Sequence, residues 1–297
     1  MIAAVLVVLG LVFGSFVNAL VWRIHEQAAE TKKKNPNKKY LTQLSIKKGR
    51  SLCPHCKHEL AAKDLVPLLS WLSLRGKCRY CGKPISAQYP LVEAVTAVLF
   101  VGSYRYWPHD LLFNHSAACP SPRLFHGVSW QADALFCLWL VLLTGLIALL
   151  VYDLRWFLLP DRLIYPLSIV AALMALISIA NASKPLVAFA NLILAIAIGG
   201  GIFYLLFQLS GGKWIGGGDV KLGWLLGLVV GTPGKALLFI FLASVLGTLI
   251  SLPLLATHRL KRTSTIPFGP LLITGVIIAQ IFGAGILHWY QHNFLNF

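Results

Sequence analysis

The feature that most constrains this chain is a series of long apolar segments without charged residues. The first, Ile2–Trp22, runs for 21 residues without a charge, which is enough α-helix to cross the hydrocarbon core of a bilayer. Similar runs recur along the 297 residues, of which only 12% are charged, about half the share found in soluble domains. Because a backbone inside lipid must satisfy its own hydrogen bonds, the sequence predicts an all-α protein that crosses the membrane several times.

We expect eight spans. Their approximate ranges are 2–22, 89–107, 132–152, 163–180, 186–209, 219–232, 236–256 and 268–289. The sixth is short and rich in glycine, so a partial or irregular helix is an alternative there. Gly231-Thr-Pro-Gly234 is a breaker sequence that separates it from the seventh.

The first apolar run defines how the chain is organised. No basic stretch precedes it and no small-residue cleavage site follows it, so we expect a retained span and no cleaved signal peptide. The predicted parts are a first helix at 1–22, an insert at 23–88, a second helix with its outer loop at 89–131, and a membrane core at 132–297.

Basic residues are concentrated between Arg23 and Gln88. This stretch contains 15 Lys and Arg residues but only 4 acidic ones, and it accounts for most of the net charge of +16. Inner loops of membrane proteins retain Lys and Arg, so we expect a cytoplasmic insert and an outer N-terminus. Alternating spans then leave 22 basic residues inside and 4 outside. This distribution favours an inner loop over the alternative, a nucleic-acid surface, and we expect no nucleic-acid partner. Segment 32–39 is also expected to contact anionic lipid headgroups.

Four cysteines in the insert predict a metal site. Cys53 and Cys56 form one CxxC pair, Cys78 and Cys81 form another, and 21 residues separate the pairs. Two such turns, which we call knuckles, can complete a four-sulfur tetrahedron around zinc. Disulfides or redox pairs are the alternative, but they rarely persist in the cytoplasm. Four thiolates leave no open position for water, so we expect a structural, zinc-ribbon-like insert.

The two knuckles differ in one residue. The second continues with Gly82, which readily adopts a left-handed conformation, whereas the first has Lys57 there. We therefore expect a looser first knuckle. His55 and His58 are expected to be solvated loop residues, and we assign no role to Cys119 and Cys137.

Only six acidic residues lie outside the insert. They are Glu93, Asp110, Asp133, Asp153, Asp161 and Asp219. Alternation puts Asp110 and Asp133 outside and the other four at the inner membrane boundary, where ionisable groups are functional candidates.

Asp153 and Asp219 are 66 residues apart in sequence, but we expect them at the same membrane depth. Asp153 ends the third span, and Asp219 begins the sixth, after three glycines that permit an unwound backbone. Two facing carboxylates that share one proton supply a base and an acid, which can activate water and hydrolyse an amide. The alternative is that each aspartate pairs with a nearby base such as Arg155, Arg162 or Lys221.

Several ordered segments resemble the type IV prepilin peptidases. The sequence GGGDVKL at Gly216–Leu222 resembles the family's GxGD signature, and YDLRWFLLPD at Tyr152–Asp161 resembles its aspartate followed by Leu-Pro-Asp. The sequence GSFVNALVWR at Gly14–Arg23 is similar to the GSFxNxxxxR motif, and Val66–Glu93 resembles the family's cytoplasmic insert.

The resemblance implies a bifunctional enzyme of the bacterial inner membrane. It would cut the basic leader from type IV prepilins or pseudopilins on the cytoplasmic side, in pilus assembly or protein secretion. It would then methylate the new amino terminus with S-adenosylmethionine. The family's catalytic aspartates correspond to Asp153 and Asp219, and Asp161 is expected to support them.

The resemblance also suggests residues for the methyltransferase part. Gly14, Asn18, Arg23 and Glu93 are the small or polar positions expected to hold S-adenosylmethionine. Helix packing is the alternative for Gly14 and Asn18, and Glu93 could instead hold Arg23 or a knuckle.

Two departures from the family pattern bear on methylation. The segment His25–Arg50 is longer and richer in lysine than expected, and Lys57 replaces a knuckle glycine. A peptidase without methylation therefore stays open as an alternative. An alternative from a different class is a transporter with a zinc-ribbon regulatory domain, since intramembrane acids and broken helices also occur in transporters.

Overall fold

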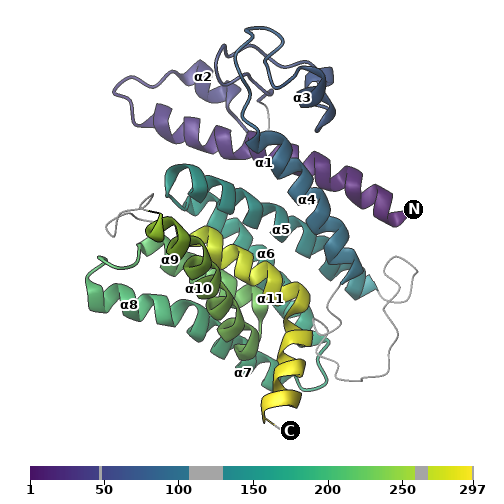
Figure 1. Cartoon of the computed structure of the whole chain (residues 1–297), viewed down its shortest axis with the longest axis vertical. Helices are drawn as coiled ribbons and strands as arrows, with labels where there is room; N and C mark the ends of the chain where they lie inside the picture. Colours follow the sequence, from purple (N-terminus) through teal and green to yellow (C-terminus); the bar gives the residue numbers. More distant parts are fainter. Residues whose placement is uncertain (47–48, 107–129, 258–266, 296–297) are drawn as a thin grey trace. The chain divides into compact units, whose positions relative to one another are not determined.

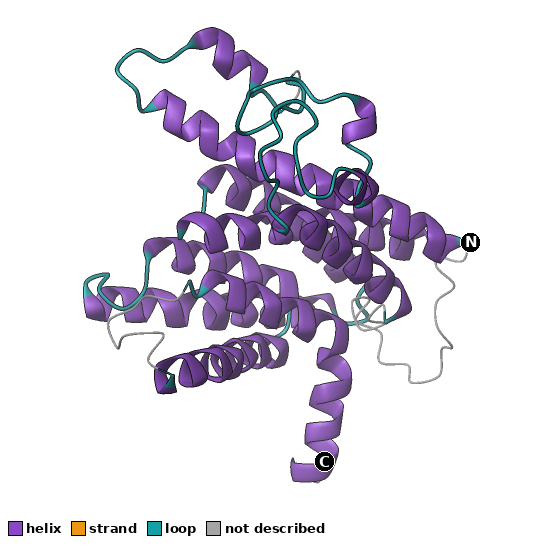
Figure 2. Cartoon of the chain, turned by 45° about the horizontal axis from the view of Figure 1, so that its top comes forward, coloured by secondary structure: helices purple, strands orange, loops and turns teal. Residues whose placement is uncertain are grey.

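The computed structural model describes residues 1–46, 49–106, 130–257 and 267–295. The predicted outer loop with Asp110 and Cys119 lies outside these ranges, apart from its last residues. The chain divides into two compact units, Met1–Arg105 and Tyr106–Phe297. The regular structure of the described residues consists of helices, without a named strand (Figure 2), as the apolar runs predict.

The first unit consists of two long helices and the insert between them. Its helices are α1 (Ile2–Thr31), α2 (Lys38–Gln43), the single turn η1 (Ala62–Asp64), α3 (Leu69–Ser73) and α4 (Gln88–Arg105). The helix α1 continues nine residues past the predicted end of the first span, because Glu26-Gln-Ala-Ala-Glu30 are good helix formers that prefer water to lipid. The end of the apolar run therefore does not mark the end of the helix.

The second unit is a bundle of apolar helices. They are α5 (Trp130–Trp156), α6 (Asp161–Ala180), α7 (Pro185–Ile196), the π-helical turn η3 (Ala197–Gly201), α8 (Ile202–Ser210), α9 (Gly217–Val230), α10 (Pro233–Ala256), α11 (Gly269–Tyr290) and the π-helical turn η4 (Gln291–Leu295). Figure 1 shows α9, α10 and α11 side by side in this unit. The predicted break is present, because Gly231 ends α9 in a left-handed conformation and Pro233 begins α10.

Six helical stretches among the described residues are long and apolar enough to cross a membrane. They are Ile2–Thr31, Trp130–Trp156, Asp161–Ala180, Pro185–Ser210, Pro233–Ala256 and Gly269–Phe294. The other two predicted spans are also helices, but α4 carries Glu93 and Arg105, and α9 has only 14 residues. A helix of that length rises about 21 Å, less than the hydrocarbon core of about 30 Å. The count of eight is therefore not confirmed, and α9 resembles the partial helix given as the alternative.

Close backbone packing holds α9 in place. A Cβ added at Gly227 would lie 2.7 Å from the Ala195 carbonyl oxygen and 2.9 Å from the Ile196 Cα. One turn earlier, Gly223 faces the carbonyl of Gly199 in the π-helical turn. Small residues four apart allow membrane helices to approach this closely. The glycines of the interrupted α7–α8 helix therefore fix the helix that begins beside Asp219.

We predict that Gly227→Ala lowers stability by about 1–3 kcal/mol, because the added methyl group meets backbone atoms that cannot rotate away. The measurement is the melting temperature of the purified protein in detergent. Gly201→Ala is the matched control, since a Cβ at Gly201 meets no atom within 4 Å. Equal melting temperatures for the two variants would contradict this account of α9.

Candidate functional site

Asp153 lies in the last turn of α5 and is 5% exposed. The helix ends just after it, because Phe157 adopts a positive φ of 54° and Pro160 follows. The Phe157 N–H donates to the Asp153 carbonyl at 2.9 Å, which closes the final turn. The carboxylate accepts a hydrogen bond from the backbone N–H of Gly269, at the start of α11. The aspartate is therefore held between the end of one helix and the beginning of another.

Asp219 is the third residue of α9, and its carboxylate reaches back to the N–H of Gly216, which caps the helix. This is the acidic half of a capping box. The expected unwound backbone is displaced: Gly217 and Gly218 are helical, and the irregular backbone lies earlier, where Gly211 and Gly212 have positive φ. A Cβ at Gly218 would lie 3.4 Å from Leu159, which is ordinary van der Waals contact, so the Leu-Pro-Asp turn packs against the beginning of α9.

The structure brings the two aspartates together. Their carboxylates are close enough to interact electrostatically, although they come from the end of α5 and the beginning of α9. Within the described residues, neither carboxylate forms an ion pair with a basic side chain. The alternative expected from the sequence, in which each aspartate is neutralised by a nearby base, is not found there.

Asp161 has a different environment. It begins α6 and forms an ion pair with Lys221, whose Nζ lies 2.7 Å from Oδ1 and 2.8 Å from Oδ2. Both side chains are nearly half exposed. This ion pair ties the beginning of α6 to α9 two residues after Asp219.

The sequence pattern did not indicate Gly269. The segment 268–289 reads only as an apolar span, yet its first helical residue touches Asp153. The available clue was the sequence Phe-Gly-Pro, in which this glycine lies at the boundary of a predicted span. A contact between residues 116 positions apart requires a three-dimensional structure.

The four insert cysteines converge. The Sγ atoms of Cys53, Cys56, Cys78 and Cys81 all lie within 4.8 Å of one another, and those of Cys53 and Cys81 are 4.0 Å apart. A zinc tetrahedron with bonds of about 2.3 Å has sulfur–sulfur edges of about 3.8 Å, whereas a disulfide is about 2.05 Å long. The cluster can therefore hold a metal ion, and its cysteines are not paired as disulfides.

The pKa of one thiol in the cluster, that of Cys81, is raised. A backbone hydrogen bond from Lys83 lowers the pKa of Cys81, but burial and the other three thiols outweigh it and raise this pKa to about 11. Metal loading of such a site releases protons.

The two knuckles share one hydrogen-bond pattern, so the first is not looser. In each, the first cysteine N–H donates to the residue five positions on, and its carbonyl accepts from the residue four positions on, all at 2.9 Å. Lys57 adopts a φ of 58°, close to the 66° of Gly82. The backbone conformation expected of glycine is therefore adopted by a lysine.

Contacts of the Lys57 side chain offset that strain. Its Nζ lies 4.9 Å from the ring centroid of Trp22 and 5.4 Å from that of Tyr40, and it pairs with Glu26 at 3.4 Å. Each cation–π contact contributes about 0.5–1 kcal/mol, comparable with the cost of a left-handed residue, about 1–2 kcal/mol. The lysine-rich segment supplies Tyr40 from α2, so the two departures from the family pattern are connected.

The four residues expected to hold the methyl donor lie around the junction of α1, α4 and the insert. Gly14 packs against Glu93, where a Cβ would lie 2.6 Å from the Glu93 Cα. Asn18 Nδ2 donates to the carbonyls of Gly14 and Tyr89 at 3.3 and 3.1 Å. The Glu93 carboxylate accepts the Leu68 N–H at 2.8 Å, and so holds the insert instead of Arg23.

Arg23 holds another part of the insert. Its guanidinium donates to the carbonyls of Ser45 and Gly49 at 3.3 and 3.1 Å. One buried acceptor in this region, Asn18 Oδ1, has no hydrogen-bond partner within the described residues.

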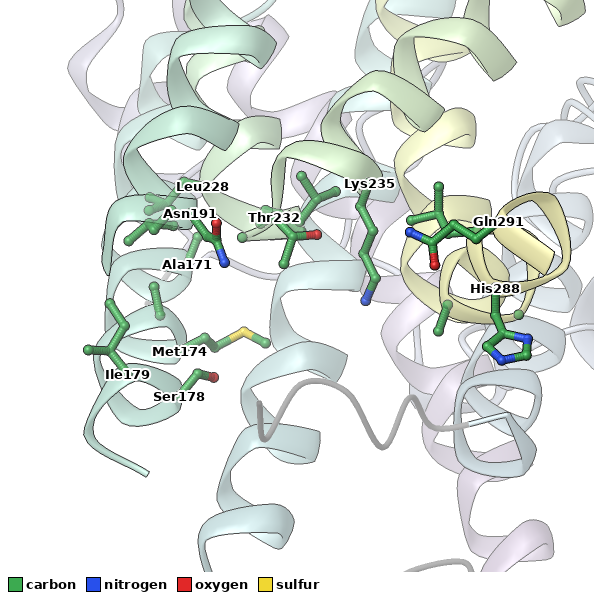
Figure 3. Close-up of a pocket in the computed structure, with 18 residues that line it drawn as sticks. Ala171, Met174, Ser178, Ile179, Asn191, Leu228, Thr232, Lys235, His288 and Gln291 are labelled. Atoms are coloured by element: carbon green, nitrogen blue, oxygen red, sulfur yellow. The ribbon is translucent and has the colours of Figure 1, made fainter. Parts of the chain in front are cut away.

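A cavity of about 550 Å³ lies at the other end of the second unit (Figure 3). Its lining comes from the last turns of α6 and α9 and from α7, α10 and α11, and includes Lys235 and His288. Asp161 and Asp219 begin α6 and α9, so a helix length separates the cavity from the aspartates. None of its described lining residues is acidic, and it is not part of the aspartate site.

The fold and the site define the class: a polytopic membrane protein with two buried aspartates at helix ends and a four-cysteine cluster. Residues 8–107 match the bacterial peptidase A24 N-terminal domain, and residues 140–252 match the type IV leader peptidase family. The chain belongs to the type IV leader peptidase family, and it is an integral protein of the bacterial inner membrane.

Similar proteins cover nearly the whole chain. The prepilin leader peptidase/N-methyltransferase of Aeromonas hydrophila is 32% identical over 96% of this chain and 92% of its own length. The protein of that name from Bacillus subtilis is 31% identical over 97% of both chains. The type 4 prepilin-like proteins leader peptide-processing enzyme of Escherichia coli O78:H11 is 32% identical over 90% of this chain and 89% of its own. No solved structure matches the chain.

We predict that Lys57→Ala destabilises the insert more than Lys57→Gly, because alanine keeps the positive φ and loses the ring contacts and the ion pair. The measurements are the melting temperature and the metal content of the purified protein. Lys83→Ala, at an exposed lysine beside the second knuckle, is the control for charge. If all three variants behave alike, the side chain of Lys57 does not compensate for its backbone.

Proposed function

We propose that this protein is a prepilin leader peptidase that also methylates the amino terminus it exposes. The observation that carries the proposal is the approach of the Asp153 and Asp219 carboxylates, without a basic partner among the described residues, inside a chain of this family. The substrates are type IV prepilins or pseudopilins, and the reaction takes place at the cytoplasmic face of the inner membrane.

The two carboxylates have the chemistry that hydrolysis requires. One in its ionised form takes a proton from water, and the other in its acid form protonates the leaving amine. The carbon–nitrogen bond breaks as the water oxygen bonds to the carbonyl carbon. Backbone N–H groups of Gly216 and Gly269 orient the two carboxylates without supplying a competing positive charge.

Asp161 acts as a supporting residue. Its ion pair with Lys221 joins the Leu-Pro-Asp turn to the first turn of α9, which carries Asp219. An exposed carboxylate already bound by two charge-assisted hydrogen bonds is a poor candidate for the base.

The orientation rests on charge. The insert carries 15 of the 26 basic residues in the chain, so the insert is cytoplasmic and the N-terminus is outside. Asp153 and Asp219 then face the cytoplasm, where the basic leader of a prepilin remains during membrane insertion. The exposed lysines of segment 32–39 contact anionic lipid headgroups.

The metal is structural zinc. The sulfur separations fit a tetrahedron, and four cysteine ligands leave no position for a substrate. Because Lys57 of the first knuckle packs against Trp22 of α1, the metal fastens the insert to the first membrane helix.

S-adenosylmethionine is the methyl donor, and the residues of the first unit fit its chemistry. The orphaned oxygen of Asn18 can accept from a hydroxyl or amino group, and the Glu93 carboxylate can face a cationic group. When bound, the cofactor supplies the methyl group. Gly14 and Arg23 shape this region through helix packing and through the turn at residues 45–49.

Two other functions make different predictions. A peptidase without methylation would leave the mature amino terminus unmodified. A transporter with a zinc-ribbon domain would carry its acids near the bilayer midplane, whereas Asp153 and Asp219 lie in a last and a first helical turn.

We predict that Asp153→Asn and Asp219→Asn each abolish leader removal while the protein still inserts, because an amide can serve neither as the base nor as the acid. The test is co-expression with a prepilin, followed by intact-mass analysis of the product, which reads cleavage and methylation together. Asp133→Asn, at the other end of α5, is the control. Normal leader removal by Asp153→Asn or by Asp219→Asn would overturn the assignment of these two aspartates as the catalytic dyad. A cleaved but unmethylated product of the wild-type enzyme would restrict the function to the peptidase.

We predict that Cys78→Ser lowers zinc from about one equivalent per chain, since a hydroxyl is a far weaker ligand than a thiolate. Zinc is measured by elemental analysis of the purified protein. Cys137→Ser is the matched control, because Cys137 lies in α5, outside the cluster. Unchanged zinc in Cys78→Ser would count against a four-cysteine site.

A further inference from the structure

The residue at the beginning of α11 has almost no room for a side chain. A Cβ built on Gly269 would lie 2.5 Å from Oδ2 of Asp153, 3.3 Å from its Cγ and 3.5 Å from Leu222 Cδ2. The φ of Gly269 is not positive, so an L-residue could adopt its backbone conformation. The requirement for glycine here is therefore one of space, and the space is taken by the Asp153 carboxylate.

The same residue also binds that carboxylate. The Gly269 N–H donates to Asp153, and it is among the first N–H groups of a 22-residue helix. Such groups have no partner within their own helix and carry the positive end of the helix dipole. A small residue allows the carboxylate to come close enough to use one of them.

Neighbouring contacts fix the position of this N–H group. Phe268, which precedes the helix, packs edge-on against Phe203 with ring centroids 6.0 Å apart. Leu222, fully buried and one turn after Asp219, packs beside Gly269. The beginning of α11 is therefore located relative to both α5 and α9, the two helices that carry the aspartates.

We propose that Gly269 is a positioning residue for the peptidase reaction. Its N–H and its bare Cα together set the orientation in which the Asp153 carboxylate faces Asp219. The proposal rests on the proposed dyad and adds a third helix, α11, to the residues that determine its geometry.

The nature of the clash defines what a substitution does. Backbone atoms cannot move cheaply, but the Asp153 carboxylate is the end of a side chain and can rotate. An alanine at Gly269 is accommodated by turning the carboxylate away from its N–H and from Asp219. The fold is kept while the dyad loses its geometry, and a displacement of about 1 Å can lower a catalytic rate on the order of 100-fold.

The experiment compares three alanine variants along α11 in purified full-length protein, with leader cleavage measured as kcat and KM. Gly269→Ala is expected to lower kcat about 100-fold or more, with KM and melting temperature near those of the wild type. Gly285→Ala, where a Cβ meets nothing within 4 Å, is expected to leave all three unchanged. Gly275→Ala, where a Cβ would lie 2.6 Å from the Phe239 carbonyl oxygen, is expected to lower the melting temperature.

A second measurement does not depend on activity. Gly269→Ala could also prove unstable or fail to fold. The proposal explains this outcome by competition between the added methyl group and the Asp153 carboxylate for the same space, so adding Asp153→Ala in the same chain should restore the melting temperature. Failure of the double variant to recover stability would overturn the proposal, as would wild-type kcat in Gly269→Ala. The variant Asp153→Asn tests the two aspartates separately. If Asp153→Asn is inactive and Gly269→Ala is fully active, the positioning role of Gly269 is wrong but the catalytic role of the aspartates is not.

Discussion

The two central carboxylates of the membrane bundle are held by backbone N–H groups at the beginnings of helices, and no ion pair with a basic side chain is found among the described residues. A lysine or arginine at this depth would fix each carboxylate as a permanent anion. An N–H group orients a carboxylate and still permits it to exchange a proton. Helix termini therefore suit a site whose chemistry depends on moving one proton between two acids. The end of α5 and the beginnings of α9 and α11 supply the two carboxylates and the N–H groups that hold them.

The first unit is organised around a different constraint, a strained residue that its neighbours compensate. Lys57 adopts a backbone conformation that glycine adopts more easily, and its side chain connects the first knuckle to Trp22, Glu26 and Tyr40. The lysine-rich segment after α1 is thus part of the metal domain. A metal ion in the cluster would order both knuckles, and through Lys57 it would also hold α1 at Trp22 and Glu26, next to Arg23 and the turn that Arg23 binds.

Much of this could be predicted from the sequence because it depends on local patterns. Charge-free runs located most of the helices, and cysteine spacing located the cluster. The count of acids left four candidates at the inner membrane boundary, and the family motifs selected Asp153 and Asp219 among them. Three features could not be read this way. The continuation of α1 to Thr31 reflects helix propensity beyond the apolar run, and the π-helical turn at Ala197–Gly201 reflects the close approach of α9. The contact between Gly269 and Asp153 joins distant segments, and no local pattern encodes it. The roles of Gly14, Asn18, Arg23 and Glu93 toward a cofactor remain predictions.

The length of α9 has a consequence at the far end of the bundle. Its 14 residues rise about 21 Å, whereas the 20 residues of α6 beside it rise about 30 Å. The ion pair between Asp161 and Lys221 joins the two helices near their beginnings, and α9 is shorter than its neighbour by six residues, or roughly two turns. The cavity lined by the last residues of both helices occupies this missing length. The cavity at one end of the bundle is therefore the space left by a short helix whose other end carries Asp219.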